Sequence, residues 1–353
     1  AGISYQSIGP TRYKTVTGSE VRTEQPQTTA SEANAVADAA GTRSTGLSAD
    51  SQLNDFTPDE CDANAWGLAA VGALDAQQVD VPLENVTVGV MDTGIDPDHK
   101  DLKEHLDASR SVGCQMNGIP NQDPSAWKDD HYHGTHVAGT IAAAHNAYGV
   151  DGVAPSATIV AIKTSNEAGS FYPEYVACAF DWAAEHDIDV TNSSYYMDPY
   201  AFWMPTEGSQ AAGLEAASRA IRYAKNHGVV NIAAEGNDND DHDNPTIDKA
   251  SPNDVEGAAV ERNVAGGIDV PAMLNDSVVS VSAVALPTGT DPATAKLERS
   301  KFSNYGKNSV DVAAPGSRIW STLPTWKKDP PFGYLSGTSM ASPHAAGVAA
   351  LIK

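Results

Sequence analysis

The stretch VTVGVMDTG, residues 86–94, indicates the fold class of this chain. It begins as a β-branched, apolar run typical of a buried strand, and it ends on Asp92, which is followed at once by a Thr-Gly turn. Three later runs have the same character: TIVAIK at 158–163, VVNIAAE at 229–235 and SVVSVSAV at 277–284. Segments with apolar residues at helical spacing, such as YVACAFDWAAEHD, separate them. Alternating strands and helices predict an α/β fold with three layers, α/β/α, around a mainly parallel sheet.

The composition excludes several classes of protein. The 353 residues include 46 acidic and 22 basic ones, which gives a formal net charge of -24. Such a surface repels nucleic acid and anionic membranes, so we expect neither as a partner. The sequence has no apolar run of about 18 residues that could span a bilayer. Its first residues, AGISYQSIGP, also lack the pattern of a signal peptide.

The composition changes once along the chain. Residues 22–60 are rich in Ser, Thr, Ala, Gln and Glu and contain hardly any large apolar residue. Such a segment cannot offset the conformational entropy that is lost on folding. We therefore predict a largely irregular N-terminal extension or linker at 1–60, followed by one folded domain at 61–353.

Three stretches carry residues that could do chemistry. Asp92 stands at a strand tip, and active sites of parallel sheets gather at the carboxyl ends of strands. His133 opens HGTHVAGT, where Gly134 has no side chain to obstruct a close approach. Ser339, in SGTSMASPHAAGVAALI, starts a predicted helix whose unpaired N–H groups favour a developing negative charge. Asp92 and Ser339 also have ordinary structural explanations, as a turn residue and as a helix cap.

Three histidines, His131, His133 and His136, lie within six positions and raise metal binding as an alternative. A zinc site would need an HExxH motif or a set of Cys and His ligands, and the sequence contains neither. Catalysis by one of the three is the better interpretation.

Taken together, the DTG turn, HGTHVAGT and GTSMASPHAAG resemble the subtilisin family of serine endopeptidases, whose triad runs in the order Asp, His, Ser. The resemblance covers about residues 62–353, and the chain looks closest to secreted actinobacterial members. It implies that Ser339 is the nucleophile, that His133 is the general base and that Asp92 orients it. Asn237 matches the side chain that binds the oxyanion in the family. His136 would then be a structural residue, and His131 would belong to a variable loop.

Family members bind the substrate peptide as an extended strand between two segments of the enzyme. The matching residues are Gly169, Ser170 and Phe171 on one side and Ser194, Tyr195 and Tyr196 on the other. The matching residues of the primary specificity pocket are Ala234, Glu235 and Gly236. Glu235 replaces a small residue of the family. It could favour a basic P1 residue, or it could point into solvent.

The resemblance also implies a structural calcium ion in the loop AHNAYGVDGVAP. Calcium prefers six to eight oxygen ligands. The implied ligands are the side chains of Asp62, Asp101 and Asn146 and the backbone carbonyls of Ala144, Tyr148 and Val150. The acidic run NDNDDHDNPTID at 237–248 is a second candidate, although no family pattern supports it.

Further expectations follow from the resemblance. The protein should be a secreted monomer that acts on polypeptides, and YQSIGPTRYKTV could be the tail of its propeptide. Cys114 and Cys178 should pair if the protein is exported, which leaves Cys61 as the odd thiol. The chain stops soon after Ser339, so its domain could be truncated there. An inactive subtilisin-like binding module is the alternative function, whereas an aspartic protease would need a second DTG or DSG.

Overall fold

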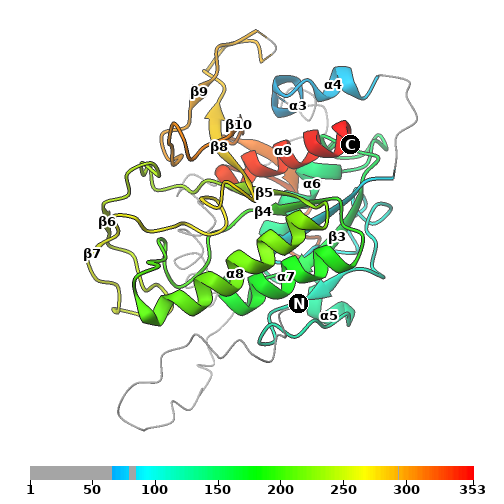
Figure 1. Cartoon of the computed structure of the whole chain (residues 1–353). Coiled ribbons are helices and arrows are strands. Elements are labelled where there is room, and N and C mark those ends of the chain that lie inside the picture. Colours follow the sequence, from blue (N-terminus) through cyan, green and yellow to red (C-terminus); the bar gives the residue numbers. More distant parts are fainter. Residues whose placement is uncertain (1–65, 79–84, 293) are drawn as a thin grey trace.

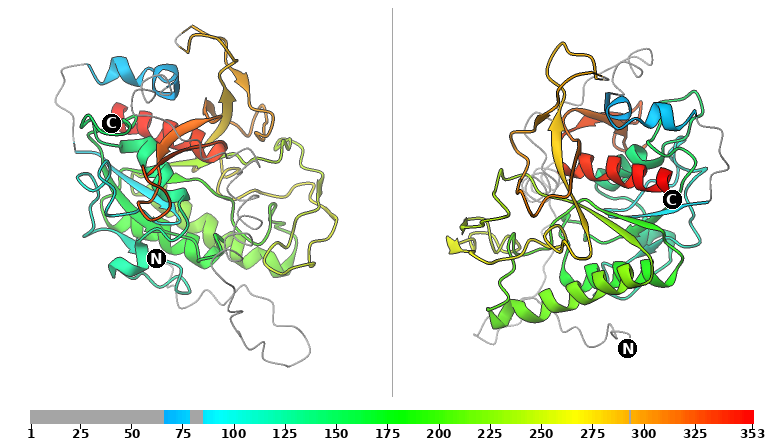
Figure 2. Two further views of the ribbon diagram at one scale, coloured as in Figure 1. Left: turned by 180° about the vertical axis from the view of Figure 1, so that it is seen from behind. Right: turned by 45° about the horizontal axis from the view of Figure 1, so that its top comes forward.

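The computed structural model describes residues 66–78, 85–292 and 294–353 (Figure 1). The expected extension at 1–60 lies outside these residues, as do Cys61 and Asp62. The described part has a sheet between two sets of helices, as Figure 2 shows from two further sides. The predicted α/β/α fold with a mainly parallel sheet is therefore confirmed.

The central sheet follows the order β10, β8, β5, β4, β1, β3, β2, and every pair along this path is parallel. The short strand β9 pairs antiparallel with β8. The four runs expected from the sequence correspond to β1, β3, β5 and β8. The strands of the sheet are β1 (Thr87–Asp92), β2 (Val112–Gly113), β3 (Thr158–Lys163), β4 (Val190–Ser193), β5 (Val230–Ala234), β8 (Val279–Ala285), β9 (Glu298–Arg299) and β10 (Val312–Pro315).

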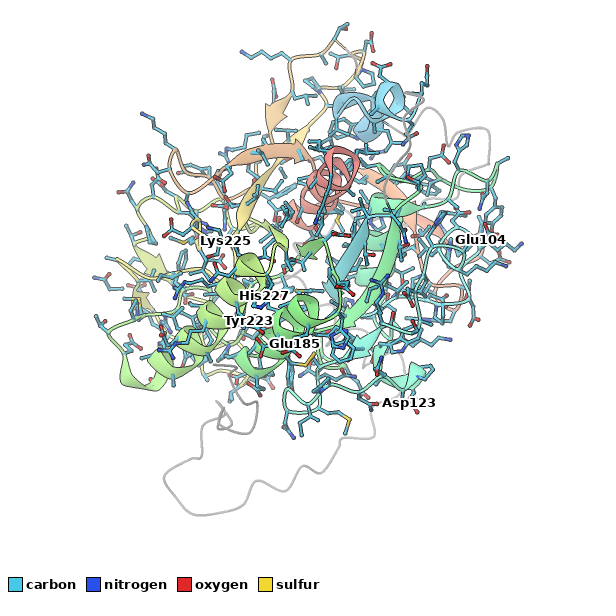
Figure 3. The ribbon with its side chains drawn as sticks, turned by 45° about the vertical axis from the view of Figure 1, so that its right-hand side comes forward. Glu104, Asp123, Glu185, Tyr223, Lys225 and His227 are labelled. Atoms are coloured by element: carbon cyan, nitrogen blue, oxygen red, sulfur yellow. A yellow bond between two sulfur atoms is a disulfide. The ribbon has the colours of Figure 1, made fainter. Side chains whose placement is uncertain are left out.

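Helices cover both faces of the sheet. The helices α6 (His133–Ala142) and α9 (Thr338–Ile352) pack together on one face, and α7 (Pro173–Glu185) and α8 (Gly208–Asn226) pack together on the other (Figure 1). Figure 3 shows Glu185 near the end of α7, and Tyr223, Lys225 and His227 near the end of α8. The shorter elements are α3 (Trp66–Ala70), α4 (Ala73–Ala76), α5 (Pro124–Trp127), the antiparallel pair β11 (Ile319–Thr322) and β12 (Phe332–Leu335), and the antiparallel pair β6 (Ile247–Asp248) and β7 (Arg262–Asn263).

The strands divide their side chains between two hydrophobic cores. In β1, Val88 and Val90 face the core that α6 and α9 cover, whereas Met91 faces the core under α7 and α8. In β3, Ile159 faces the core under α6 and α9, and Ile162 faces the core under α7 and α8. Successive residues of a strand point to opposite faces, so a strand buried on both faces must be apolar throughout. This explains the unbroken apolar runs in the sequence.

A disulfide fastens one outer helix to the sheet. Cys114 follows β2 and Cys178 lies in the middle of α7, and their Cα atoms are 5.8 Å apart. The predicted pairing is therefore confirmed. No helix in the described ranges is long and apolar enough to cross a membrane.

Candidate active site

The carboxyl ends of β1, β4 and β5 lie side by side at one edge of the sheet. Met91 is in register with Ser193, which is in register with Ala233 of β5. The chain segments that leave these strands therefore start next to one another. This edge gathers residues from distant parts of the sequence, as expected for a parallel sheet.

Asp92 and His133 form a buried pair at this edge. The Nδ1 atom of His133 is 2.8 Å from Oδ1 and 3.0 Å from Oδ2 of Asp92, and both side chains are fully buried. A carboxylate can only accept, so Nδ1 carries the proton and Nε2 is left as the acceptor. Within the described residues, Nε2 of His133 has no hydrogen-bond partner. The imidazole is thus oriented to take up a proton at Nε2.

Glycines allow the pair to come close. A Cβ atom on Gly134 would lie 2.2 Å from the carbonyl oxygen of Gly94 and 3.1 Å from Cβ of Asp92. Gly94 itself has a φ of 107°, and a Cβ there would lie 2.6 Å from the carbonyl oxygen of Trp127. The space next to Gly134 is therefore filled by the β1 turn that carries Asp92.

The buried carboxylate of Asp129 fixes the turn before α6, and the sequence alone did not single it out. Its Oδ1 accepts hydrogen bonds from the N–H groups of His131 and Tyr132, each 2.9 Å long. Tyr132 has a φ of 125°, a strained value for a residue with a side chain. These bonds hold the strained turn that places His133 at the first position of the helix.

Asp129 is also connected to the turn after β1. The hydroxyl of Thr93 donates to Oδ1 of Asp129 over 2.9 Å and accepts from the N–H of Gly134 over 2.9 Å. The N–H of Thr93 in turn donates to Oδ1 of Asp92 over 2.7 Å. One network therefore aligns both members of the Asp92–His133 pair.

The two neighbouring histidines are placed as structural residues. Nε2 of His136 lies 3.1 Å from the carbonyl oxygens of Ile319 and Gly333, so it ties α6 to the β11–β12 hairpin. The ring of His131 stacks on Tyr132 with the centroids 4.5 Å apart. Burial lowers the pKa of both histidines to about 3, so they stay uncharged. In the described ranges, no three His, Cys, Asp or Glu residues form a group that could hold a metal ion.

Ser339 lies at the second position of α9, buried against the end of β4. Its hydroxyl is 3.2 Å from the carbonyl oxygen of Ser194, and the hydroxyl of Ser194 donates to the carbonyl oxygen of Ser339 over 2.9 Å. The start of α9 is therefore anchored to the segment that follows β4. Helix α9 also packs against α6, which begins with His133.

Asn237 is held against the same helix start. Its Oδ1 accepts from the N–H and the hydroxyl of Thr338, at 2.8 Å and 3.1 Å. The N–H of Gly236 donates to the hydroxyl of Thr338 over 3.0 Å. Because the amide oxygen of Asn237 accepts from Thr338, its Nδ2 donor points away from Thr338.

The two expected substrate segments are connected by Asp198, which the sequence also did not reveal. Its Oδ2 accepts from the N–H of Phe171 over 2.6 Å, and its own N–H donates to the carbonyl oxygen of Phe171 over 2.8 Å. The buried rings of Phe171 and Tyr195 stack with the centroids 4.2 Å apart. Both backbone groups of Phe171 are therefore already engaged within the protein.

Other polar groups complete these segments. The side chain of Asn166 accepts from the N–H of Ser170 over 3.0 Å and stabilises the turn in which Gly169 has a φ of 77°. On the other side, Asn253 bridges the hydroxyl of Tyr196 and Oδ1 of Asp198. Burial raises the pKa of Asp198 to about 7.

Glu235 does not point into solvent, so that alternative is wrong. Its side chain is 0% exposed, and Oε1 is 2.8 Å from Nδ1 of His242, which is also buried. His242 comes from the acidic run at 237–248. Glu235 follows Ala234, the last residue of β5, and is joined through Gly236 to Asn237. Its carboxylate therefore lies inside the protein next to the expected specificity pocket.

The expected calcium ligands surround Asp101. This fully buried carboxylate accepts from Nδ2 of Asn146 over 3.3 Å and from the N–H of Val150 over 3.1 Å. Its carbonyl oxygen accepts from the N–H of Ala144, and Oδ1 of Asn146 accepts from the N–H of Tyr148. Burial raises the pKa of Asp101 to about 6. Three of the predicted ligand residues, Ala144, Asn146 and Val150, therefore bond directly to Asp101, and Tyr148 bonds to Asn146.

In the other candidate calcium segment, Asp243 has a different role. It accepts from the N–H groups of Lys307, Asn308 and Ser309, so it anchors a neighbouring loop.

Comparisons with known proteins identify the family of this chain. A model of the subtilase family matches residues 84–353. The chain is 33% identical over 287 residues to subtilisin DY of Bacillus licheniformis, which covers 81% of this chain and 83% of that protein. It is 36% identical over 268 residues to subtilisin E of Bacillus subtilis (strain 168), which covers 76% of this chain and 55% of that protein. The expected likeness to actinobacterial members stays a prediction.

Solved structures show the same fold. A cold adapted subtilisin-like serine proteinase matches with a TM-score of 0.52 and 28% identity, over 81% of this chain and 84% of the other. The epidermin leader peptide processing serine protease of Staphylococcus aureus matches with a TM-score of 0.63 over 85% of this chain and 72% of the other; at 24% identity the likeness is one of fold. The chain therefore belongs to the subtilase family and is a subtilisin-like serine protease.

Proposed function

We propose that the protein is an endopeptidase in which Ser339 attacks the scissile bond, His133 is the general base and Asp92 orients His133. The observation that carries this proposal is the buried Asp92–His133 pair, whose Nε2 atom is left as an acceptor at the edge where α9 begins. A serine hydroxyl is a weak nucleophile at neutral pH and needs such a base.

The proposed reaction has two halves. His133 Nε2 takes the hydroxyl proton as Oγ of Ser339 bonds to the carbonyl carbon, and it then gives the proton to the leaving amine as the C–N bond breaks. Water next hydrolyses the resulting ester: His133 takes its proton and returns it to Ser339. Asp92 stabilises the imidazolium that forms in both halves without becoming protonated itself.

The oxyanion would be bound by two donors, Nδ2 of Asn237 and the N–H of Ser339. The N–H of Ser339 stands in the first turn of α9, at the helix end that favours negative charge. The bonds from Thr338 fix the amide of Asn237 before the substrate arrives. Preorganised donors of this kind stabilise the charge that develops in the transition state.

We place the substrate peptide between Gly169–Phe171 and Ser194–Tyr196, with its P1 side chain next to Ala234, Glu235 and Gly236. Since Asp198 engages the backbone of Phe171, pairing with the peptide would use neighbouring backbone groups. We assign the peptidase domain to 61–353 and retain the propeptide, within 1–60, as a candidate partner. We propose that the monomeric protein acts outside the cell, and the Cys114–Cys178 disulfide supports an oxidising location.

We also propose a structural calcium ion at Asp101. A buried carboxylate with a raised pKa lacks a compensating positive charge, and Ala144, Asn146, Tyr148 and Val150 lie around it. Their carbonyl oxygens and the oxygen of Asn146 are hard ligands of the kind that calcium prefers. Asp62 lies outside the described residues, so it stays a predicted ligand.

Labelling with a fluorophosphonate probe tests the assignment of the nucleophile. The wild type should be labelled on Ser339, and Ser339→Ala should not be labelled. Ser342→Ala, which removes a buried hydroxyl one turn later in α9, is the matched control and should keep the label. An unlabelled wild type would favour the inactive binding module, and a label that persists in Ser339→Ala would refute the assignment.

A further inference from the structure

A second carboxylate, Asp269, lies next to the residues expected to line the specificity pocket. A Cβ atom on Gly236 would be 3.7 Å from Oδ2 of Asp269. The carbonyl oxygen of the next residue, Val270, accepts from the N–H of Met197, which directly follows the Ser194–Tyr196 segment. Asp269 is thus held between the segment after β5 and the segment after β4.

Asp269 and Glu235 each have one side-chain oxygen that accepts no hydrogen bond within the described residues. Within the described residues, Oδ1 of Asp269 and Oε2 of Glu235 are buried and make no hydrogen bond. The side chain of Asp269 is 7% exposed and that of Glu235 is 0% exposed. A buried carboxylate without donors is costly unless a cation or a donor completes it. Two such atoms in one place point to a ligand that brings positive charge and several N–H groups.

His242 does not supply the missing donor to Asp269. Oδ1 of Asn304 accepts from the N–H groups of Asp238 and Asp240, which fixes the amide so that its Nδ2 donates to Nε2 of His242 over 2.9 Å. This nitrogen must therefore be an acceptor, and it is 3.8 Å from Oδ2 of Asp269.

The protonation of His242 is subject to opposing influences. Burial disfavours its charged form, but the hydrogen bond that its Nδ1–H donates to Glu235 and the nearby carboxylates raise its pKa overall. The contact with Asn304 opposes this rise, because an uncharged ring is needed to accept at Nε2. When both carboxyls are ionised, the single positive charge that His242 can carry offsets only one of them.

Neither a nearby cation nor a metal ion accounts for these two carboxylates. The guanidinium of Arg262 donates to the carbonyl oxygen of Phe202 and faces Asp248 instead. In the described part of the chain, no group of three or more His, Cys, Asp and Glu side chains is arranged to hold a metal ion. Burial raises the pKa of Asp269 to about 8, as expected for a carboxyl without a compensating charge.

We propose that Asp269, supported by Glu235, makes this protease select a substrate with a cationic side chain, arginine or lysine, at P1. The inference rests on the proposed function and names its substrate class. The guanidinium or ammonium N–H groups would donate to these two unpaired carboxylate oxygens, and charge-assisted bonds of this kind are strong in a buried place. The net charge of -24 also favours the approach of cationic peptides.

Matched peptides that differ only in charge at P1 test the proposal. We would measure kcat/KM for the full chain on fluorogenic peptides with arginine or citrulline at P1, and with lysine or norleucine. Citrulline has the shape of arginine without its charge. The wild type should prefer arginine over citrulline by on the order of 100-fold or more, because citrulline lacks the positive charge and has a carbonyl oxygen where arginine has a donating NH2 group.

Variants identify the residue responsible. Asp269→Asn should reduce the preference for arginine over citrulline by about 30-fold or more, and Glu235→Gln should reduce it less, since removing one partner of a buried charge pair is costly. In both variants kcat/KM should fall more on the arginine peptide than on the norleucine peptide. Asp181→Asn, which changes a buried carboxylate in α7, is the control and should keep the preference.

The outcomes separate the two proposals. Equal hydrolysis of arginine and citrulline peptides by the wild type, or an unchanged preference in Asp269→Asn, would overturn the inference and leave the proposed function intact. No hydrolysis of any peptide, together with no labelling of Ser339, would overturn the proposed function and this inference with it.

Discussion

Replacing Asp129 by Asn tests whether one buried carboxylate fixes the position of His133. In the wild type, Oδ1 accepts from two backbone N–H groups and from Thr93, while Oδ2 accepts from the N–H of Thr135 over 3.0 Å and from its hydroxyl over 2.5 Å. Asparagine keeps one of these oxygens. Its NH2 group would then face the N–H of Thr135, and two donors cannot satisfy one another.

The magnitude follows from these contacts. Each hydrogen bond to a charged group contributes about 1.5–3 kcal/mol, so losing two would cost about 3–6 kcal/mol. Burial raises the pKa of Asp129, so removing its charge recovers part of that cost. We expect the free energy of unfolding to fall by about 2–4 kcal/mol. A displacement of His133 by about 1 Å would also lower kcat by about 100-fold.

Urea unfolding, followed by tryptophan fluorescence, measures the first effect. It should be done in the Ser339→Ala background so that self-digestion does not interfere, and kcat should be measured with Ser339 intact. The control is Asp123→Asn at the exposed N-cap of α5 (Figure 3), where asparagine caps about as well as aspartate. If Asp129→Asn unfolds within about 0.5 kcal/mol of its parent and kcat is unchanged, the carboxylate does not fix the turn.

Three other predictions concern separate features of the protein. Asn237→Leu should lower kcat and leave KM nearly unchanged, because the bond to the oxyanion strengthens only in the transition state; a change in KM alone, in steady-state kinetics, would contradict the assignment. Replacing both Cys114 and Cys178 by Ser opens a loop with a sequence separation of 64 and should lower the free energy of unfolding in denaturant by about 4 kcal/mol. An unchanged unfolding midpoint would show that the disulfide does not stabilise the fold. The folded-state pKa of Asp101, about 6, exceeds the unfolded value, so without calcium the contribution of this group to stability should fall as pH rises from about 4 to 6. Calcium binds the ionised carboxylate, so the stabilisation by calcium in thermal scans should grow over the same pH range. Asp101→Ala should abolish that growth.

The sequence predicts those features of the fold that depend on local pattern. The unbroken apolar runs of β1 and β3 predict burial on both faces, and the residue at the tip of β1, Asp92, does lie beside His133. The Cys114–Cys178 pair is also predicted, although by resemblance to relatives.

The missed residues depend on contacts between distant segments. Asp198 and Asp269 are ordinary acidic residues in the sequence, and only the fold brings them next to Phe171 and Gly236. The sequence leaves two orientations open for Glu235, because nothing in it marks His242, in the acidic run at 237–248, as the partner of this carboxylate. Asp129 does have a local signal, since it stands four residues before His133 in the HGT motif. A carboxylate this close to a helix start is a candidate acceptor for the free N–H groups of the first turn.

The position of α9 has a consequence for the timing of activity during folding. This helix packs against β4, β5, β8 and α6, whose residues lie far from it in the sequence. Contacts over such separations form slowly, because long loops must close first. Under the proposed assignment, Ser339 therefore reaches His133 only when the parallel sheet has already formed. Before that stage, a partly folded chain would be a substrate for finished copies and could not itself cut a peptide bond.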